Sequence, residues 1–267
     1  MSSNGNITKD GQPTGNYIDG LVSVVMPMHN SERFLREAVE SVIAQTYANW
    51  ELFIIDDASN DNSLAIAKEY EAQDKRIHVL QNETPIGRPS APRNIGIKAA
   101  RGRFISFLDS DDFYFPKKIE QQLPLFEEEK VAIVFSNYEK VSEQGERRNR
   151  IVKAPEYADY DFLLKGNVIG NLTGMYDRSK TGTVFIEDRH HEDYVMWLSI
   201  LKRGFVAKNT QTVNGGYRVR TSSVSAHKFE TAKWQWHIYR HVENLSLIRS
   251  VCCFAFYAVK AMKKRFI

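Results

Sequence analysis

Apolar and polar positions alternate in blocks along the first half of the chain. Between residues 21 and 137, short runs of β-branched and aromatic residues are separated by stretches in which apolar side chains recur every three to four positions. The first pattern is typical of buried strands and the second of amphipathic helices. Their alternation predicts an α/β fold with a mostly parallel central sheet that is flanked by helices.

The same pattern locates the individual elements and the loops between them. In chain order we expect strand 22–26, helix 32–44, strand 51–55, helix 63–72, strand 77–81, helix 93–100 and strand 104–108. In open α/β sheets, ligands bind beyond the carboxyl ends of the parallel strands. The loops that follow these strands should therefore meet at one binding site.

The pattern changes in the second half of the chain. The charged segment 139–153 predicts a loop or flap, and 170–175 with a strand at 183–186 should form the floor of a substrate site. From residue 228 onward the pattern is helical. We therefore divide the chain into a flexible tail at 1–20, a main domain at 21–226 with halves 21–137 and 138–226, and a helical extension at 227–267.

Length, charge and cysteine content narrow the class of protein. The 267 residues, of which 42% are hydrophobic, suffice for one large domain with a helical appendage. A formal net charge of +3 is too balanced to indicate a nucleic-acid partner. Cys252 and Cys253 are adjacent, and neighbouring cysteines rarely bridge, so we expect reduced thiols in a reducing, cytoplasmic compartment. Residues 1–20 lack the apolar core of a signal peptide.

The helical extension raises the question of a membrane. Its apolar run 251–259 is too short to span a bilayer, which takes about 20 residues. The run ends in Lys260, Lys263, Lys264 and Arg265, and an aromatic, amphipathic helix with a basic end suits the anionic inner face of the cytoplasmic membrane. Packing of this helix on the main domain is an equally weighted alternative.

An acidic run, Asp109-Ser110-Asp111-Asp112, directly follows the apolar strand 104–108. Carboxylates at the end of a buried strand are costly without a cation between them, and a divalent ion that holds a diphosphate meets that need. A plain turn would explain an isolated Asp-Ser-Asp as well. The chain has neither a dinucleotide glycine fingerprint nor a Gly-Lys-Ser/Thr phosphate loop. A metal would therefore have to balance the charge of a diphosphate, which indicates an enzyme for nucleotide-activated substrates.

Several ordered motifs lie between residues 22 and 225. They are 23–30 (SVVMPMHN), 55–59 (IDDAS), 91–96 (APRNIG), 107–112 (FLDSDD) and Glu192-Asp193. In this order and spacing they resemble the family 2 glycosyltransferases, inverting enzymes of GT-A fold that use nucleotide sugars. The stretch 217–225 resembles bacterial enzymes of cell-surface polysaccharide assembly, including the teichuronic-acid type. The resemblance implies a donor-binding half at 21–137 and an acceptor half at 138–226.

The resemblance assigns the nucleotide pocket to loops after the first two strands. It implies that Pro27, His29 and Asn30 line this pocket and that Asp57 contacts the edge of the base. A carboxylate beside uracil can accept its ring N–H, so a UDP-sugar is the favoured donor. The family often has Tyr where this chain has His29, and imidazole can also stack on a base.

The resemblance also places charged residues around the diphosphate. It implies that Arg93 lies near the base and diphosphate, with Arg88 as a second candidate for the same role. The alternative for Arg93 is a solvated residue in the first turn of a helix. It makes Asp109 the ribose contact, Asp111 the direct metal ligand and Asp112 a further candidate. Carboxylates, phosphate oxygens and waters are the ligands of Mg²⁺ or Mn²⁺.

Glu192 and Asp193 begin a predicted helix. Acidic residues are favoured at a helix start whatever their function. An inverting transfer, however, needs a carboxylate to remove a proton from the acceptor hydroxyl, and Asp193 resembles that base. Glu192, His191 and Trp197 are candidates for the acceptor side, although the spacing of Trp197 is more often that of a core residue.

The resemblance therefore predicts transfer of a single sugar to a glycan or lipid-linked acceptor in the cell envelope, because the Gln-x-x-Arg-Trp motif of processive members is absent. A sugar-nucleotide nucleotidyltransferase is the alternative enzyme, but it needs a glycine-rich, basic loop after the first strand. A non-catalytic carbohydrate-binding protein is the other alternative, and it would have no use for metal-binding carboxylates beside a nucleotide pocket.

Overall fold

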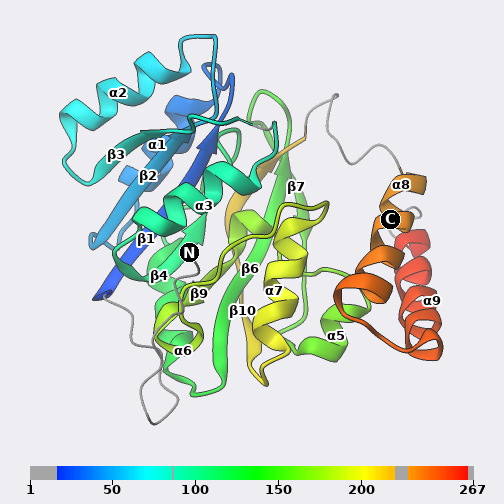
Figure 1. Ribbon diagram of the computed structural model, residues 1–267. Coiled ribbons are helices and arrows are strands. Elements are labelled where there is room, and N and C mark those ends of the chain that lie inside the picture. The colour runs from blue at the N-terminus through cyan, green and yellow to red at the C-terminus, as the bar shows by residue number, and fades with distance from the viewer. Residues whose placement is uncertain (1–16, 86, 220–227, 264–267) are drawn as a thin grey trace, which may run out of the picture.

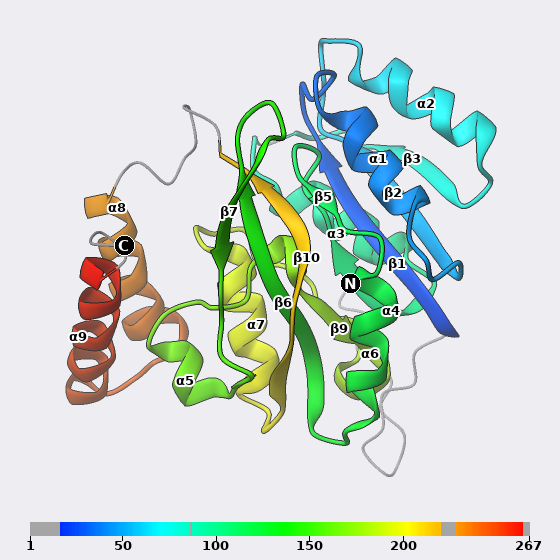
Figure 2. The same cartoon turned by 180° about the vertical axis from the view of Figure 1, so that it is seen from behind.

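The fold is a ten-stranded sheet with helices on both faces, seen in a computed structural model that describes residues 17–85, 87–219 and 228–263. The tail 1–16, part of the 217–225 stretch, and Lys264 and Arg265 lie outside the described residues. Figure 1 shows α3 and α7 over one face of the sheet, and Figure 2 shows α1 and α4 over the other.

The first half has the expected alternation of strands and helices. Its elements are β1 (Ile18–Met28), α1 (Leu35–Ile43), β2 (Trp50–Asp56), α2 (Ser63–Gln73), β3 (Ile77–Gln81), α3 (Ser90–Ala99) and β4 (Gly102–Phe107). Strands β3, β2, β1 and β4 lie side by side and run parallel. All seven residues of β2 are buried, as expected for a strand covered on both faces.

The sheet begins earlier in the chain than we expected. Ile18 pairs with Gly102, so residues 18–20, which composition assigned to the tail, belong to β1. The register shifts between Ile18 and Val22, and Gly20 has a φ of +70°. Glycine adopts this conformation at little cost, which lets the chain re-enter the sheet after an irregular step.

The second half adds antiparallel pairs and makes the sheet mixed. Its elements are β5 (Phe113–Tyr114), α4 (Lys118–Gln122), β6 (Val131–Val141), β7 (Arg147–Val152), β8 (Tyr157–Ala158), α5 (Tyr160–Leu164), β9 (Met175–Asp177), α6 (Arg178–Thr181), α7 (Glu192–Leu201) and β10 (Val206–Arg218). Strand β9 lies between β4 and β6 and is antiparallel to both, whereas β6 and β10 are parallel. The prediction of a central sheet that is mostly parallel and flanked by helices is confirmed.

The segment 139–153 is a β-hairpin arm, so its prediction as a loop or flap is wrong. Strands β6 and β7 pair from Tyr138 with Val152 to Val141 with Arg147. Glu139 is buried and accepts hydrogen bonds from the Arg147 side chain and the Asn149 amide, at 2.7 and 2.8 Å. The run of charges disguised the strand, because charged side chains are common on edge strands such as β7.

The expected strand at 183–186 is also wrong. The segment has no regular secondary structure, and it pairs with a side chain instead of a strand. The Asn94 side-chain amide donates to the Ile186 carbonyl at 2.7 Å and accepts from the Ile186 N–H at 2.7 Å. Asn94 therefore attaches the start of the 187–191 loop to α3.

The carboxyl-terminal extension consists of α8 (Lys228–His237), a π-helical turn (Ile238–Val242) and α9 (Leu247–Lys263). Gln235 of α8 donates to the Tyr194 hydroxyl of α7 at 3.2 Å, and the Tyr239 hydroxyl of the π-helical turn donates to the Leu164 carbonyl of α5, so the extension packs on α7 and α5. Figure 1 shows α9 on the outer side of α8. Among the described residues, no helix combines the length and the apolar character needed to cross a bilayer.

Candidate active site

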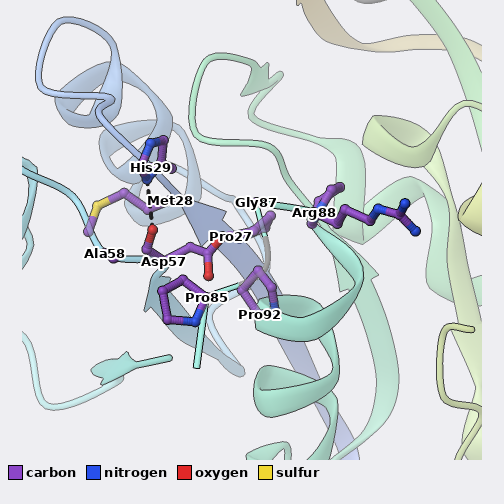
Figure 3. A pocket seen from close by; sticks show the side chains of 10 residues that line it. Pro27, Met28, His29, Asp57, Ala58, Pro85, Gly87, Arg88 and Pro92 are labelled. Atoms are coloured by element: carbon purple, nitrogen blue, oxygen red, sulfur yellow. Dashed lines mark hydrogen bonds between the residues drawn. The ribbon is translucent and has the colours of Figure 1, made fainter. Parts of the chain in front are cut away.

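A cavity of about 410 Å³ opens at the carboxyl ends of β1 and β2. Its walls are Pro27, Met28, His29, Asp57, Ala58, Pro85, Gly87, Arg88, Pro89 and Pro92 (Figure 3). The wall is therefore mostly apolar and rich in proline, with one carboxylate, one imidazole and one guanidinium. This combination suits a flat heterocycle that needs stacking surface and a few hydrogen bonds.

Hydrogen bonds hold the polar groups of this cavity in place. The His29 Nδ1–H donates to the carbonyl of Asp57 at 2.7 Å, and the Asp57 amide donates to the Met28 carbonyl at 2.8 Å. Asn82 donates to Oδ1 of Asp57 at 2.6 Å, and Figure 3 shows the Asp57 carboxylate beside Pro27 and Pro85. The structure thus brings together Pro27, His29 and Asp57 as the sequence predicted.

Asn30, in contrast, does not line the cavity. Its side chain accepts from the Asn60 amide at 2.8 Å and lies 3.1 Å from Nε2 of His29. Asn30 and Ala58 both have left-handed backbones, with φ of 47° and 58°. Strained conformations of this kind persist where a site needs a particular loop shape. Asn30 therefore supports the loop that carries His29.

Arg93 joins three separate segments of the chain. Its buried guanidinium donates to Asp109 at 2.5 Å and to Glu192 at 2.7 Å, so α3 is tied to the acidic run and to the start of α7. Burial opposes the charge, but the facing carboxylates of Asp109 and Glu192 outweigh it and raise the pKa of Arg93 above its ordinary value. The alternative of a solvated arginine is wrong.

Glu192 and Asp193 are neighbours with different environments. Glu192 is paired with Arg93, whereas Asp193 accepts a longer hydrogen bond from the Asn167 amide, at 3.3 Å. Burial, followed by the charge of Glu192, raises the pKa of Asp193 to about 6, against the opposing effect of Arg93. A carboxylate with a pKa near neutral that is not held in an ion pair suits a general base.

Asp193 lies between two further cavities. One, of about 180 Å³, is lined by Asp109, Asp112, Tyr138, Gly170, Asn171, Leu172, Asp193 and Tyr217. The other, of about 580 Å³, is lined by residues of the 87–90 loop, the 189–193 segment and α8. The segment 170–172 therefore forms part of a wall, as expected for the floor of a substrate site. A group bound on either side can reach the same carboxylate.

The acidic run is held by Arg218 at the end of β10. The Arg218 amide donates to Oδ1 of Asp112 at 2.8 Å, and its Nε donates to the Asp111 carbonyl at 2.8 Å. Burial first, and then the charges of Asp109 and Asp111, raise the pKa of Asp112 well above its ordinary value. Mutual repulsion of this kind is what a bound cation would relieve.

The donor set of this loop fits a hard cation only in part. No group of three His, Cys, Asp or Glu side chains within the described ranges is placed to hold a metal by itself. Mg²⁺ and Mn²⁺ commonly take one or two carboxylates and complete their shells with phosphate oxygens and water. Asp111 and Asp112 can supply the protein ligands of such a site, and a diphosphate would have to supply others.

Comparison with known proteins assigns the family. The model of "Glycosyl transferase family 2" matches residues 23–182, which include the residues of the proline-rich cavity, Arg93 and the acidic run. This chain belongs to glycosyltransferase family 2.

Similar glycosyltransferases cover almost the whole chain. It is 38% identical over 246 residues to "Putative teichuronic acid biosynthesis glycosyltransferase TuaG" of Bacillus subtilis, a match that spans 92% of this chain and 97% of that protein. It is 40% identical over 224 residues, 82% of this chain and 85% of the relative, to the Escherichia coli enzyme "UDP-Glc:alpha-D-GlcNAc-diphosphoundecaprenol beta-1,3-glucosyltransferase WfgD".

Solved structures confirm the GT-A-like fold of the glycosyltransferase. Staphylococcus aureus TarS 1–349 in complex with UDP-GlcNAc has a TM-score of 0.68 at 19% identity, over 89% of this chain and 71% of that one. The mannosyltransferase PcManGT from Pyrobaculum calidifontis, in complex with GDP-Man and Mn²⁺, has a TM-score of 0.67 at 14% identity, over 89% and 68% of the two chains.

Of the three residues that we expected on the acceptor side, two line a cavity and one is buried in the core. Trp197 has no exposed surface and packs edge-on to Phe107 and close to Gly174, so the prediction that it contacts an acceptor is wrong. Its indole fills the core beneath the site because the apolar face of α7 points inward. His191 and Glu192 do line the 580 Å³ cavity.

Sequence reasoning missed two residues that position the active site of the glycosyltransferase. Arg218 also donates to the carboxylate of Glu37 and to the Glu143 carbonyl, so it links α1 and the β6–β7 arm to the acidic run. Asn167 holds Asp193. Neither has a local signal, because the partner of Asn167 is 26 residues away in the chain and those of Arg218 are up to 181 residues away.

Proposed function

We propose that this glycosyltransferase moves a single sugar, with inversion, from a UDP-sugar to a glycan or lipid-linked acceptor in the synthesis of a cell-surface polysaccharide. The observation that carries the proposal is the position of Asp193, a carboxylate with a raised pKa between two cavities, while the adjacent Glu192 is held by Arg93. The names of the relatives support the surface-polysaccharide role and the diphosphate-linked acceptor.

The nucleotide of the donor would occupy the proline-rich cavity. A uracil there could place its ring N–H against the Asp57 carboxylate and stack between His29 and the proline walls. The ribose and diphosphate would extend toward Asp109, which lines the next cavity at the end of β4. Arg93 holds Asp109 in place by a 2.5 Å ion pair and supplies positive charge close to the diphosphate.

Asp111 and Asp112 would hold Mg²⁺ or Mn²⁺ together with the diphosphate. When bound, such an ion neutralises the negative charge that develops on the leaving diphosphate. Arg218 fixes the loop that presents these carboxylates, through the Asp111 carbonyl and the Asp112 carboxylate.

Asp193 would act as the general base. It removes the proton from an acceptor hydroxyl while that oxygen forms a bond to the anomeric carbon. The bond between the anomeric carbon and the diphosphate oxygen breaks on the opposite side, so the nucleoside diphosphate leaves and the configuration inverts. Glu192 cannot take this role while it is paired with Arg93, at 2.7 Å.

Calorimetric titration tests the donor site. Wild-type protein should bind UDP with an affinity that rises when Mn²⁺ is added, and Asp111→Ala should lose that rise. Transfer assays with UDP-sugars then test catalysis, with Asp193→Asn expected to bind UDP normally and to lose transfer. UDP binding without any transfer by wild type would favour a carbohydrate-binding protein, and pyrophosphate release from UTP and a sugar phosphate would favour a nucleotidyltransferase.

The extension would bring the enzyme to the inner face of the cytoplasmic membrane as a peripheral protein. The outer face of α9 exposes large apolar side chains, at Leu247, Ile248, Val251, Phe256 and Val259. A lipid-linked acceptor would be presented at that surface, and the basic residues at the end of the chain would meet its anionic lipids. Ile248→Glu, at a side chain that is 79% exposed, should reduce cosedimentation with anionic vesicles, and unchanged cosedimentation would refute this localisation.

A further inference from the structure

The largest of the cavities beside Asp193 is partly built by the carboxyl-terminal extension. Its 580 Å³ are enclosed by Gly87, Arg88, Pro89, Ser90, Arg189, His190, His191, Glu192, Asp193, Thr231 and Trp234. Thr231 and Trp234 belong to α8, whereas the other lining residues belong to the main domain. The extension therefore contributes to a cavity that also contains the proposed base.

An aromatic stack forms one wall of this cavity. The rings of His190 and Trp234 are parallel, with centroids 3.8 Å apart and planes 7° apart, and His191 meets Trp234 edge-on at 5.6 Å. The neighbouring residue Gln235 anchors α8 through the Tyr194 hydroxyl, so Trp234 is held on a fixed element. His191 has a left-handed backbone, with φ of 57°, directly before Glu192 and Asp193. The wall is a built feature of the fold and adjoins the reaction centre.

Both arginines that line this cavity are paired with carboxylates of the 187–191 loop. Arg88 pairs with Asp188 at 3.2 Å, and Arg189 pairs with Glu187. A free phosphate would have to compete with these carboxylates for both arginines. A neutral ligand with an apolar face and hydroxyl groups would instead use the aromatic wall and leave the ion pairs intact.

We propose that this cavity binds the sugar ring of the acceptor, and that Trp234 of α8 determines acceptor affinity. The inference rests on the proposed function. The nucleotide cavity lies on the other side of the same loop, since both cavities share Gly87, Arg88 and Pro89. A sugar stacked on the His190–Trp234 wall would present its hydroxyl groups toward Asp193, and the carboxyl-terminal extension would contribute to specificity for the acceptor.

The test compares two tryptophans of the same helix. Trp236 packs edge-on against Phe254 of α9 and does not line the cavity, so Trp236→Ala is a matched control for damage to the extension. Transfer would be measured on the full chain, from a UDP-sugar to a panel of short-chain alkyl diphosphates that carry GlcNAc, glucose or galactose. Trp234→Ala should raise the KM for the best acceptor at least tenfold, equivalent to about 1.4 kcal/mol. Trp234→Phe should recover part of that loss, and UDP affinity should stay within twofold of wild type.

The outcomes separate this inference from the proposed function. An unchanged acceptor KM in Trp234→Ala, or an equal rise in Trp236→Ala, would overturn the assignment of the wall. Loss of UDP affinity in Trp234→Ala would show that the residue acts on the donor site and would overturn it too. Wild-type protein that binds UDP but transfers to no sugar of the panel contradicts the acceptor class, whereas failure to bind any nucleoside diphosphate contradicts the proposed function itself.

Discussion

Replacing Asp193 by Asn removes the proposed base with little change in shape. The amide can still accept the hydrogen bond from Asn167, so the start of α7 should keep its structure. General base catalysis by a positioned carboxylate contributes about 10²- to 10⁴-fold to a rate. Asp193→Asn should therefore lower kcat by that factor while UDP affinity stays unchanged.

The raised pKa gives the wild-type enzyme a defined pH dependence. With a pKa of about 6, Asp193 is about 90% ionised at pH 7 and about 10% ionised at pH 5. Only the ionised form can accept the proton, so kcat/KM should fall roughly tenfold between pH 7 and pH 5. Glu192→Gln removes a neighbouring negative charge that raises this pKa, and it should shift the acidic limb to lower pH.

The same shift makes Asp193 unfavourable for stability at neutral pH. Because its pKa in the folded state lies above the ordinary value of 3.8, the folded protein binds this proton more tightly than the unfolded chain does. The free energy of unfolding therefore falls as the pH rises from about 4 to about 6, and the full cost is present above that range. The neutral Asn has no such cost, so Asp193→Asn should raise the free energy of unfolding at pH 7 by about 1 to 3 kcal/mol.

Two measurements decide the outcome. Transfer assays between pH 5 and pH 8 give the activity and its acidic limb, and urea unfolding at pH 7 gives the stability. An inactive variant that is also more stable cannot owe its inactivity to misfolding. Residual activity above a few per cent in Asp193→Asn, or a limb near pH 6 that survives in it, would refute the assignment of the base.

The remaining predictions concern the supports of the site. Gly96→Ala should lower the free energy of unfolding by about 1 to 3 kcal/mol in urea titration, since the new Cβ would lie 2.6 Å from a methyl group of Val25 and 2.8 Å from one of Ile55. Arg93→Ala should cost about 3 to 5 kcal/mol by the same method, because both of its carboxylate partners lose a buried cation. Ala58→Gly should raise the free energy of unfolding by less than about 1 kcal/mol, which would appear as a small rise in the midpoint of thermal unfolding. The reason is that relief of the left-handed backbone at residue 58 outweighs the added conformational entropy of the unfolded chain.

Local pattern predicted the first half of the fold and failed where long-range pairing decides the structure. The run from β1 to β4 follows from periodicity, because each element carries its own apolar face. The β6–β7 arm was missed because its charged residues hide the alternation, and Ile186 was assigned to a strand although its partner is the Asn94 side chain. No pattern within a short window contains the information about a partner 92 residues away.

In the candidate site, too, local motifs located some residues, while long-range contacts decided the roles of others. The motifs identified Pro27, His29, Asp57 and the acidic run, since each follows a predictable strand. They favoured Asp193 over Glu192 as the base only through the family resemblance, because both residues belong to the first turn of α7. The physical difference between the two carboxylates arises when α3 brings Arg93 within 2.7 Å of Glu192.

The motif at 91–96 also connects three parts of the proposed site. Arg93 ties the acidic run to the start of α7, and the next residue, Asn94, holds Ile186 at the start of the loop that leads to His190 and His191. Gly96 lets α3 approach the sheet closely enough for both contacts. One helix, α3, thus sets the position of the proposed base and of the proposed acceptor wall. Substitutions in α3 should disturb transfer through these positions even where they leave the nucleotide cavity intact.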